Sequence, residues 1–317
     1  MRDDGGGRFA SKSKRGIVLN ILLTGANGFT GLRFTALAQQ AGHSVTALQV
    51  DMTQPRAVSE ALASAVAALP PAQPWAVVHL AALSFVGHAE ALAFYGVNVL
   101  GTLNLLAALV GQPCRPSCVL VASSANVYGN CPQSPIVESQ TPAPVNHYAA
   151  SKLAMEHLVR TYADQLPLVL TRPFNYTGPG QALQFLIPKL VSHFARRAPV
   201  VELGNLHVER EYNDVDFVCR SYLHLLAHGE PQGLYNICTG ITYTLEDVIA
   251  RLRRLTRHDI EVRVNRDFVR VNEIQRLCGD PARLQAVWCA AGDVWPTATS
   301  LDSTLARMLI AAEACEK

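Results

Sequence analysis

The sequence predicts an α/β fold in which helices cover both faces of a doubly wound parallel sheet. From residue 17 onward, short apolar runs alternate with longer amphipathic stretches in βαβαβ order. The apolar runs are continuous instead of alternating with polar residues, as expected for strands that are buried on both faces. The chain has 317 residues, of which 49% are hydrophobic and 16% charged, so it is large enough to bury such a core.

The first half of the chain supplies most of the predicted sheet. Continuous apolar runs predict strands at residues 17–23, 44–49, 75–80, 118–122 and 166–170. The amphipathic stretches between them predict helices at residues 29–40, 56–69, 89–110 and 147–163. A helix between two strands lets the second strand run parallel to the first, so this order favours a parallel sheet.

The pattern changes after Arg172, where Gly178-Pro179-Gly180 interrupts the alternation. The remaining residues predict helices at 183–197, 216–228, 245–256 and 301–313, and short strands at 200–203, 234–238 and 260–264. We therefore expect a main domain and a smaller mixed α/β lobe at the C-terminal side. The main domain comprises residues 17–175, with 214–240 returning to it, and the lobe comprises residues 176–213 and 241–317.

Composition excludes several classes of protein. A net charge of +2 provides no basic surface for nucleic acid, and prolines break the most apolar later stretch, 61–83, before it reaches the length of a membrane span. Residues 1–16 contain three consecutive glycines and mixed charges, which predicts a disordered leader and not a secretory signal. Eight cysteines without a Cys-x-x-Cys pair predict reduced thiols in the cytoplasm, and they indicate neither a disulfide framework nor a metal site.

A glycine-rich segment, Thr24-Gly25-Ala26-Asn27-Gly28-Phe29-Thr30-Gly31, joins the first strand to the first helix. Gly25 permits a tight turn, Gly28 lets the backbone approach a pyrophosphate, and Gly31 allows the helix to pack closely on the sheet. The N-terminus of the helix offers unpaired N–H groups to phosphate oxygens. The segment therefore predicts a Rossmann-type dinucleotide site.

The group that binds the cofactor's 2′ position is left open by the sequence. The second strand ends Ala47-Leu48-Gln49-Val50, without the acidic residue that holds a ribose 2′-hydroxyl. Arg33 could pair with a 2′-phosphate, or it could be a solvated helix residue. Asp51 and Met52, just beyond that strand, are candidates for contacting adenine, and the cofactor is either NADP or NAD.

Tyr148 and Lys152 lie four residues apart on a helix that Asn146 could cap, so both side chains share one face. An ammonium near a phenol stabilises the phenolate, and we expect it to lower the tyrosine pKa from about 10 toward working pH. Ser124 follows the strand at 118–122, at the edge where doubly wound sheets bind ligands. These three side chains predict acid/base chemistry at a substrate oxygen.

His79 lies near the end of the predicted strand at 75–80. Alone, it is better explained as a core histidine whose ring nitrogens have hydrogen-bond partners.

Together these segments resemble the NAD(P)-dependent epimerase/dehydratase family of extended short-chain dehydrogenases/reductases, which act on nucleotide sugars. The resemblance covers nearly all of residues 18–312. It rests on the segments 24–31, 79–82, 98–102 (Asn-Val-Leu-Gly-Thr), 124–129, Tyr148 with Lys152, and 172–181 (Arg-Pro-Phe-Asn-Tyr-Thr-Gly-Pro-Gly-Gln). It implies that the smaller lobe binds the substrate.

The resemblance also implies roles for individual residues. Tyr148 would be the acid/base, Lys152 its electrostatic partner and ribose ligand, and Ser124 the donor to the substrate oxygen. The cofactor would also contact Gly25, Asn27, Gly28, Phe29, Gly31, Asp51, Met52, Leu80, Ala81, Ala82 and Asn98. The substrate would contact Val86, Ser124, Asn126, Asn175, Gln184, Phe185, Arg210, Arg270 and Glu273.

Three functions fit this reading. Ala125 and Asn126 stand where sugar 4,6-dehydratases place a carboxylate pair, and neither titrates, so dehydration is disfavoured. Segments 172–181, 210–215 and 234–240 are most similar to reductases that convert GDP-4-keto-6-deoxy-mannose to GDP-rhamnose, which implies reduction of a nucleotide 4-keto-6-deoxy sugar. Epimerisation of a nucleotide sugar at carbon 4 and a non-catalytic NAD(P)-binding sensor are the alternatives.

The helices at 89–110 and 147–163 are poor in charge, with Glu90, Lys152, Glu156 and Arg160 their only Lys, Arg, Asp or Glu residues. An exposed helix would carry more charge. The resemblance implies that these two helices pair with their copies in a homodimer, through a four-helix bundle.

Overall fold

A computed structural model describes residues 18–70, 73–87, 89–265, 268, 274–296 and 299–315, the last without its side chain. The leader expected at residues 1–16 lies outside the described residues, as do Arg270 and Glu273.

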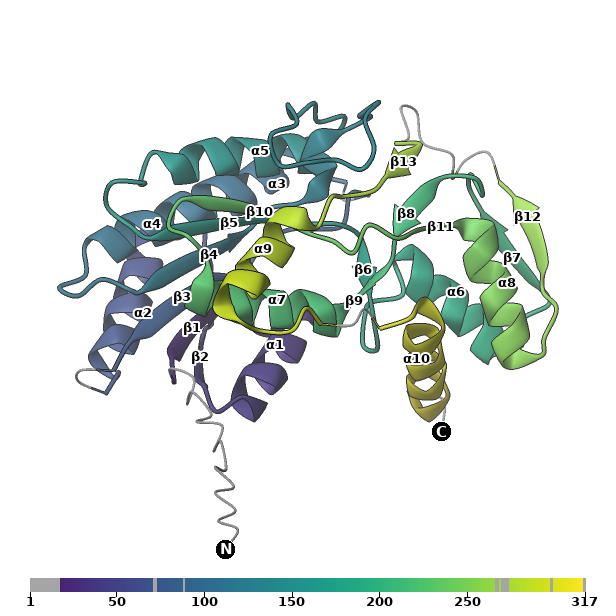
Figure 1. Cartoon of the computed structure of the whole chain (residues 1–317), viewed down its shortest axis with the longest axis horizontal. Helices are drawn as coiled ribbons and strands as arrows, with labels where there is room; N and C mark the ends of the chain where they lie inside the picture. The colour runs from purple at the N-terminus through teal and green to yellow at the C-terminus, as the bar shows by residue number, and fades with distance from the viewer. Residues whose placement is uncertain are drawn as a thin grey trace, which may run out of the picture.

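A six-stranded parallel sheet in the order β10-β5-β4-β3-β1-β2 forms the centre of the larger part of the molecule (Figure 1). Every contact between neighbouring strands is parallel. Its strands are β1 (Asn20–Thr24), β2 (Ser44–Leu48), β3 (Trp75–His79), β4 (Cys118–Ala122), β5 (Leu168–Pro173) and β10 (Gly233–Ile237). The predicted doubly wound α/β class is confirmed, and the strand expected at 234–238 is the sixth strand of this sheet.

Helices cover both faces of the sheet, so the strands have a core on either side. On one face, α1 (Phe29–Gln40) and α7 (Val215–His228) contribute Phe34, Leu37, Val218 and Tyr222 to one hydrophobic cluster. On the other, α2 (Pro55–Ala67), α4 (Gly101–Val110) and α5 (His147–Arg160) contribute a second cluster that includes Leu62, Leu105 and Val159. Burial on both faces is the reason that β1, β3 and β4 are apolar without alternation.

The single helix expected at 89–110 is divided into three parts. It comprises α3 (Ala91–Tyr95), a π-helical turn η1 (Gly96–Leu100) and α4. Asn98 in this turn donates from Nδ2 to the Leu83 carbonyl and to Ser151 Oγ, and its Oδ1 accepts from the Leu83 amide. At Gly101, a Cβ would lie 2.9 Å from Met52 Cβ, so the helix packs tightly on the segment after β2. These contacts are tertiary, and helical periodicity does not reveal them.

A second group of elements surrounds its own hydrophobic cluster, at the right of Figure 1. It contains α6 (Leu186–Ala195), α8 (Leu245–Thr256) and α10 (Leu301–Cys315), with the strands β7 (Val200–Leu203) and β12 (Glu261–Val264) paired in parallel. Short strands lie between the two groups: β6 (Tyr176–Thr177), β8 (Glu209–Glu211), β9 (Asn213–Asp214), β11 (Thr242–Thr244) and β13 (Arg276–Leu277). A 3₁₀ turn, η2 (Ala125–Tyr128), follows β4. The domain boundaries stay a prediction.

Helix α9 (Ala282–Ala291) was not expected from the sequence. Although it lies in the range assigned to the smaller lobe, its Leu284 packs into the sheet cluster beside α7, together with Val287 and Trp288. Only Leu284 is fully buried along this helix, so its amphipathic pattern is weak.

The buried carboxylate of Glu211 ties the junction between the two groups together. It accepts from the backbone amides of Gly279 (2.7 Å), Thr239 (2.8 Å) and Gly240 (3.3 Å), and from Asn213 Nδ2 (2.9 Å). Burial raises the pKa of Glu211, whereas these four donors lower it. A carboxylate with this many donors fixes the three segments relative to one another.

Candidate active site

The glycine segment adopts the tight turn that its sequence predicts. Gly25 has a φ of +72°, and a Cβ there would lie 2.7 Å from the Ala81 amide nitrogen. At Gly31, a Cβ would lie 2.2 Å from the Gly25 carbonyl oxygen, so the helix must have glycine to pack on the turn. Gly28 is exposed at the N-cap of α1, without a side-chain cap for the first-turn N–H groups.

The loop after β3 packs directly on this turn. The Ala81 amide donates to Thr24 Oγ1 (3.2 Å), and the Leu80 amide donates to the Thr24 carbonyl (3.3 Å). His79 is buried between two hydroxyls, Thr24 Oγ1 at 2.7 Å and Thr102 Oγ1 at 2.9 Å, and burial lowers its pKa to about 3. His79 is therefore a neutral core residue, as expected. Leu80, Ala81 and Ala82 form a half-buried rim beside the turn.

These features fit a dinucleotide. The N-terminal turn of α1 presents backbone N–H groups, and a Cβ at Gly28 would contact only the Gly25 carbonyl, at 3.3 Å, among neighbouring atoms. Backbone can therefore approach a pyrophosphate closely at Gly28. Asn27 and Phe29 flank this position.

The residues expected to contact the adenosine part of the cofactor differ in how exposed their side chains are. The Asp51 carboxylate is exposed and accepts from the amide (2.9 Å) and hydroxyl (2.7 Å) of Thr53, which lowers its pKa. Met52 is buried in the core, so its backbone, but not its side chain, is available to adenine. Asn98 is likewise buried, with its amide hydrogen-bonded to Leu83 and Ser151, so its side chain positions the loop after β3, and its contact with a cofactor stays a prediction.

Arg33 is partly exposed, and its guanidinium already has an acidic partner. Its guanidinium forms a bidentate pair with Asp216 of α7, and Arg307 of α10 joins the same carboxylate. Asp216 is the largest influence on Arg33 and raises its pKa. This pairing crosses from α1 to α7, and nothing in the local sequence around Arg33 reveals it.

Ser124 is held as a hydrogen-bond donor at the C-terminal end of β4. Its Oγ accepts from the Asn126 amide (3.2 Å) and from Asn126 Nδ2 (3.1 Å). A hydroxyl has two acceptor positions and one proton, so accepting twice directs the Ser124 proton toward another acceptor. Asn126, expected to contact substrate, acts on Ser124 in this structure.

Tyr148 and Lys152 occupy the first two turns of α5, where Asn146 Oδ1 accepts from the Ala149 amide (2.9 Å) as the expected cap. Both side chains are buried, and Tyr148 is hydrogen-bonded to Ser124. Lys152 Nζ donates to the carbonyl of Ala122, the last residue of β4, at 2.8 Å. The three predicted catalytic side chains therefore meet at the end of β4.

The expected lowering of the Tyr148 pKa is wrong for this structure. Burial raises the Tyr148 pKa above its ordinary value, and the hydrogen bond to Ser124 only partly opposes it. Burial also lowers the pKa of Lys152 to about 8, although Glu156 raises it. Desolvation of the phenolate thus outweighs the influence expected from the neighbouring ammonium. At neutral pH Tyr148 is a phenol and therefore a proton donor.

On the substrate side, the expected contact residue Phe185 faces Phe85. The rings of Phe85 and Phe185 meet edge to face with centroids 5.8 Å apart, which brings the loop after β3 to the segment before α6. Val86 is half-buried beside Phe85, whereas Gln184 and Asn175 are exposed. Arg210 is half-buried on β8, with Nη1 donating to the carbonyls of Glu209 (2.9 Å) and Gln275 (3.4 Å).

Two sets of contacts near the site, those of Tyr176 and those of Arg172, were not predicted from the sequence. Tyr176 Oη lies 2.8 Å from Thr30 Oγ1 and its ring stacks on Phe29, so the segment after β5 closes on the start of α1. Arg172, part of the 172–181 motif, is buried and forms a bidentate pair with Glu156 of α5 at 2.6 and 2.8 Å. A sequence separation of 16 residues hides this pair from helical spacing rules.

A glycine turn at the first βα junction, joined to a serine, tyrosine and lysine at the end of β4, defines an NAD(P)-dependent enzyme of the extended short-chain dehydrogenase/reductase class. A model of the NAD dependent epimerase/dehydratase family matches residues 21–238, and the chain belongs to that family.

Individual relatives extend this match over most of the chain. A GDP-6-deoxy-D-talose 4-dehydrogenase of Aggregatibacter actinomycetemcomitans is 35% identical over 271 residues, covering 84% of this chain and 90% of that protein. A GDP-6-deoxy-D-mannose reductase of Pseudomonas aeruginosa is 33% identical over 280 residues, covering 83% and 89%. The structure of RMD from Pseudomonas aeruginosa complexed with NADPH matches with a TM-score of 0.82 at 30% identity, covering 95% and 99%.

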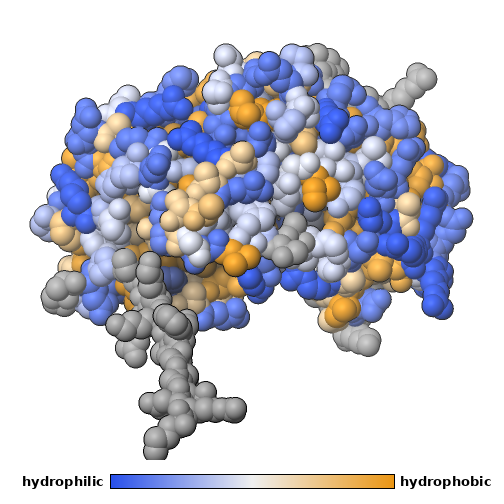
Figure 2. Space-filling model, in the orientation of Figure 1, coloured by the Kyte–Doolittle hydropathy of each residue, from blue (hydrophilic) through white to orange (hydrophobic). Residues whose placement is uncertain are grey.

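One helical stretch, Ala91–Val110, is long and apolar enough by composition to cross a membrane. In the fold it packs on α2 and α5 and contributes to the hydrophobic cluster on that face of the sheet. On the face seen in Figure 2, apolar residues are scattered among polar ones.

Proposed function

We propose that the chain is an NAD(P)H-dependent reductase of a nucleotide 4-keto-6-deoxy sugar, of the kind that converts GDP-4-keto-6-deoxy-mannose to GDP-rhamnose. The observation that carries this proposal is that Ser124 and the buried Tyr148 lie together at the end of β4, with the non-titrating residues Ala125 and Asn126 directly after Ser124. The two relatives named as GDP-6-deoxy-sugar enzymes support GDP as the nucleotide.

The chain's own residues supply the proton and the orientation. Ser124, already accepting twice from Asn126, donates its proton to the carbonyl oxygen at carbon 4. Tyr148 gives its proton to that oxygen as negative charge develops on it. Lys152, fixed by the Ala122 carbonyl and with a pKa of about 8, is largely protonated at neutral pH and stabilises the phenolate that results. When bound, the reduced nicotinamide supplies the hydride.

The relatives named as a GDP-6-deoxy-D-mannose reductase and a GDP-6-deoxy-D-talose 4-dehydrogenase favour reduction over the alternative, 4-epimerisation. A reductase begins with a phenol that gives up its proton, and the raised pKa of the buried Tyr148 agrees with that starting state. Dehydration is disfavoured because a proton must also move at carbons 5 and 6, and neither Ala125 nor Asn126 can carry it.

We infer that Arg210 contacts the substrate diphosphate. The glycine turn is suited to the cofactor's pyrophosphate, so the substrate requires a cation on the side of the smaller lobe. Two carbonyls hold Arg210 Nη1 in place, which orients its guanidinium fork. The other arginine expected here, Arg270, and Glu273 lie outside the described residues.

The test of the reductase is stoichiometry. Purified protein is mixed with NADH or NADPH and a panel of nucleotide 4-keto-6-deoxy sugars, and absorbance of the reduced nicotinamide is followed beside product formation. We expect one reduced cofactor to be consumed per sugar. Interconversion of saturated UDP- or GDP-hexoses without added reductant, with no reduction of any 4-keto sugar, would establish the epimerase instead.

We also infer a homodimer formed through α5 and the helical stretch that contains α3 and α4. The outward side of that stretch carries Leu92, which is 81% exposed, and Leu100, which is 55% exposed. Pairing with a second copy would bury both leucines. We expect a dimer by light scattering at micromolar concentration and a shift toward monomer in Leu100→Glu. A fully active wild-type monomer would contradict this arrangement.

Cytoplasmic location is part of the same proposal. The seven cysteines whose side chains the structure describes are free thiols, and four of them are buried. Free thiols agree with a reducing compartment.

A further inference from the structure

Two histidines one helical turn apart near the end of α7 lie beside a carboxylate from the segment after α9. His224 and His228 share one face of α7, with ring centroids 4.6 Å apart. His224 Nδ1 lies 3.7 Å from Asp293 Oδ2. One possible ligand atom from each of the three residues lies within 4.8 Å of the other two. The sequence reading did not single out this trio, because Asp293 is distant in sequence and cysteines are absent from it.

Asp293 is held in this position by the end of α9. Gly292, with a φ of +73°, ends the helix, and its amide donates to the Cys289 carbonyl at 3.0 Å. The Asp293 amide donates to the Trp288 carbonyl, also at 3.0 Å. These two bonds are a glycine-terminated helix cap, so the backbone that bears the carboxylate is fixed before any ligand arrives.

The orientation of the His224 ring is also fixed, in this case by packing. Its side chain is 6% exposed, and its ring stacks on Trp288 with centroids 3.7 Å apart and an angle of 9°. Nε2 is buried and has no hydrogen-bond partner. The separation between Nδ1 and the carboxylate, 3.7 Å, is too long for a hydrogen bond. The ring is therefore held mainly by packing against Trp288, beside the backbone of Val287.

A metal ion accounts for the spacing. Two ligands at about 2.1 Å from a tetrahedral ion lie about 3.4 Å apart, close to the gap between Nδ1 and Asp293. Imidazole nitrogen and carboxylate oxygen are ligands for divalent ions such as Zn²⁺, Co²⁺ and Ni²⁺.

We propose that His224, His228 and Asp293 form a site for a divalent transition-metal ion, most suited to Zn²⁺, that fastens the segment after α9 to α7. The ion would take three protein ligands and water.

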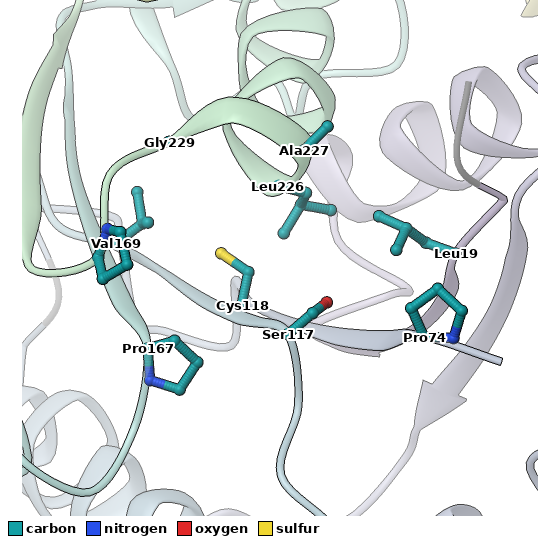
Figure 3. A pocket seen from close by; sticks show the side chains of 10 residues that line it. Leu19, Pro74, Ser117, Cys118, Pro167, Val169, Leu226, Ala227 and Gly229 are labelled. Carbon is teal, nitrogen blue, oxygen red and sulfur yellow. The ribbon is translucent and has the colours of Figure 1, made fainter. Parts of the chain in front are cut away.

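This site is remote from the candidate active site. Helix α7 begins beside Asp214, near the C-terminal edge of the sheet, and ends at Gly229. Leu226, Ala227 and Gly229 line a small pocket with residues that lie at or just before the starts of strands, including Leu19, Pro74 and Ser117 (Figure 3). The two histidines therefore lie toward the edge opposite Ser124 and Tyr148, and the role of the ion is structural.

The test uses full-length protein freed of metal with a chelator and then titrated with Zn²⁺ against a chromophoric competitor. We expect one ion per chain, with affinity weakened at least about tenfold in His228→Gln and in Asp293→Asn. His207→Gln is the matched control, because His207 is also an exposed histidine near a carboxylate, 3.6 Å from Glu246, but has no third ligand nearby among the residues that the structure describes. We expect its affinity to equal that of the wild type.

Two further measurements keep the outcome clear. Zn²⁺ should raise the melting temperature of the wild type more than that of either variant, because only binding to the folded site stabilises it. The Co²⁺ derivative should show weak visible bands without the intense near-ultraviolet absorption of thiolate ligation. Equal affinity in wild type, His228→Gln and Asp293→Asn, thiolate absorption, or no binding of Zn²⁺ by the wild type would each overturn the site.

Discussion

Tyr148→Phe should lose roughly 10²–10⁴-fold in turnover, which is the usual worth of a positioned proton donor. The phenol is buried and hydrogen-bonded to Ser124, so its hydroxyl is aimed at the place where the substrate oxygen would lie. Phenylalanine keeps the ring and its edge-to-face contact with Phe94, 6.0 Å between centroids, so the fold should persist. The measurement is kcat with NADPH or NADH and a nucleotide 4-keto sugar, beside the cofactor Kd.

Cofactor affinity should change little in this variant, because the loss concerns proton transfer. Tyr95→Phe is the control: Tyr95 also lies close to α5, with its hydroxyl 3.1 Å from His147 Nδ1, outside the Ser124–Tyr148–Lys152 group. Near-normal turnover in a folded Tyr148→Phe would remove the catalytic assignment and favour the cofactor-binding sensor.

Glu156→Gln should destabilise the protein by about 3–5 kcal/mol, the usual cost of breaking a buried ion pair from one side. Glu156 and Arg172 each have only 2% of the side chain exposed, and they share two short bonds. Without the carboxylate, Arg172 remains charged and buried over the Tyr128 ring. The free energy of unfolding from a urea titration measures the loss.

Glu156→Gln should also change the pH dependence of activity. Glu156 raises the pKa of Lys152, which burial lowers to about 8, so removing its charge should lower the Lys152 pKa further. Lys152 would then lose its proton at lower pH, and the alkaline limb of the activity profile should move toward neutral pH. Glu60→Gln, in the exposed pair with Arg56, is the control and should change neither property. A Glu156→Gln protein as stable as Glu60→Gln would contradict the account of this pair.

The local sequence pattern predicted the sheet because a strand that is buried on both faces is a continuous apolar run. Helices 29–40 and 245–256 and strand 200–203 agree with the structure at both ends. Short strands such as β6 and β9 have no such apolar run. Their two residues form a strand only because the segment after β5 pairs with the segment before α7. The break at Gly96–Leu100 similarly depends on Asn98 reaching Leu83.

In the candidate site, short-range spacing in the sequence predicted correctly which neighbouring residues lie together. Tyr148 and Lys152 share a helix face, and Gly25 and Gly31 serve a single turn. The sequence did not reveal contacts with distant partners: Arg33 pairs with Asp216 across 183 residues, and the Met52 side chain packs in the core. The Tyr148 pKa was misjudged because spacing reveals the neighbouring cation but not the burial that outweighs it.

The most direct test of the central claim follows a label from cofactor to sugar. Reduced cofactor carrying deuterium on the transferred position of the nicotinamide is incubated with GDP-4-keto-6-deoxy-mannose and wild-type protein, and the product is measured by mass spectrometry and NMR. The account predicts a GDP-6-deoxy-hexose that carries one deuterium at carbon 4. A product without deuterium at carbon 4, or unchanged substrate beside folded, cofactor-loaded protein, would contradict it.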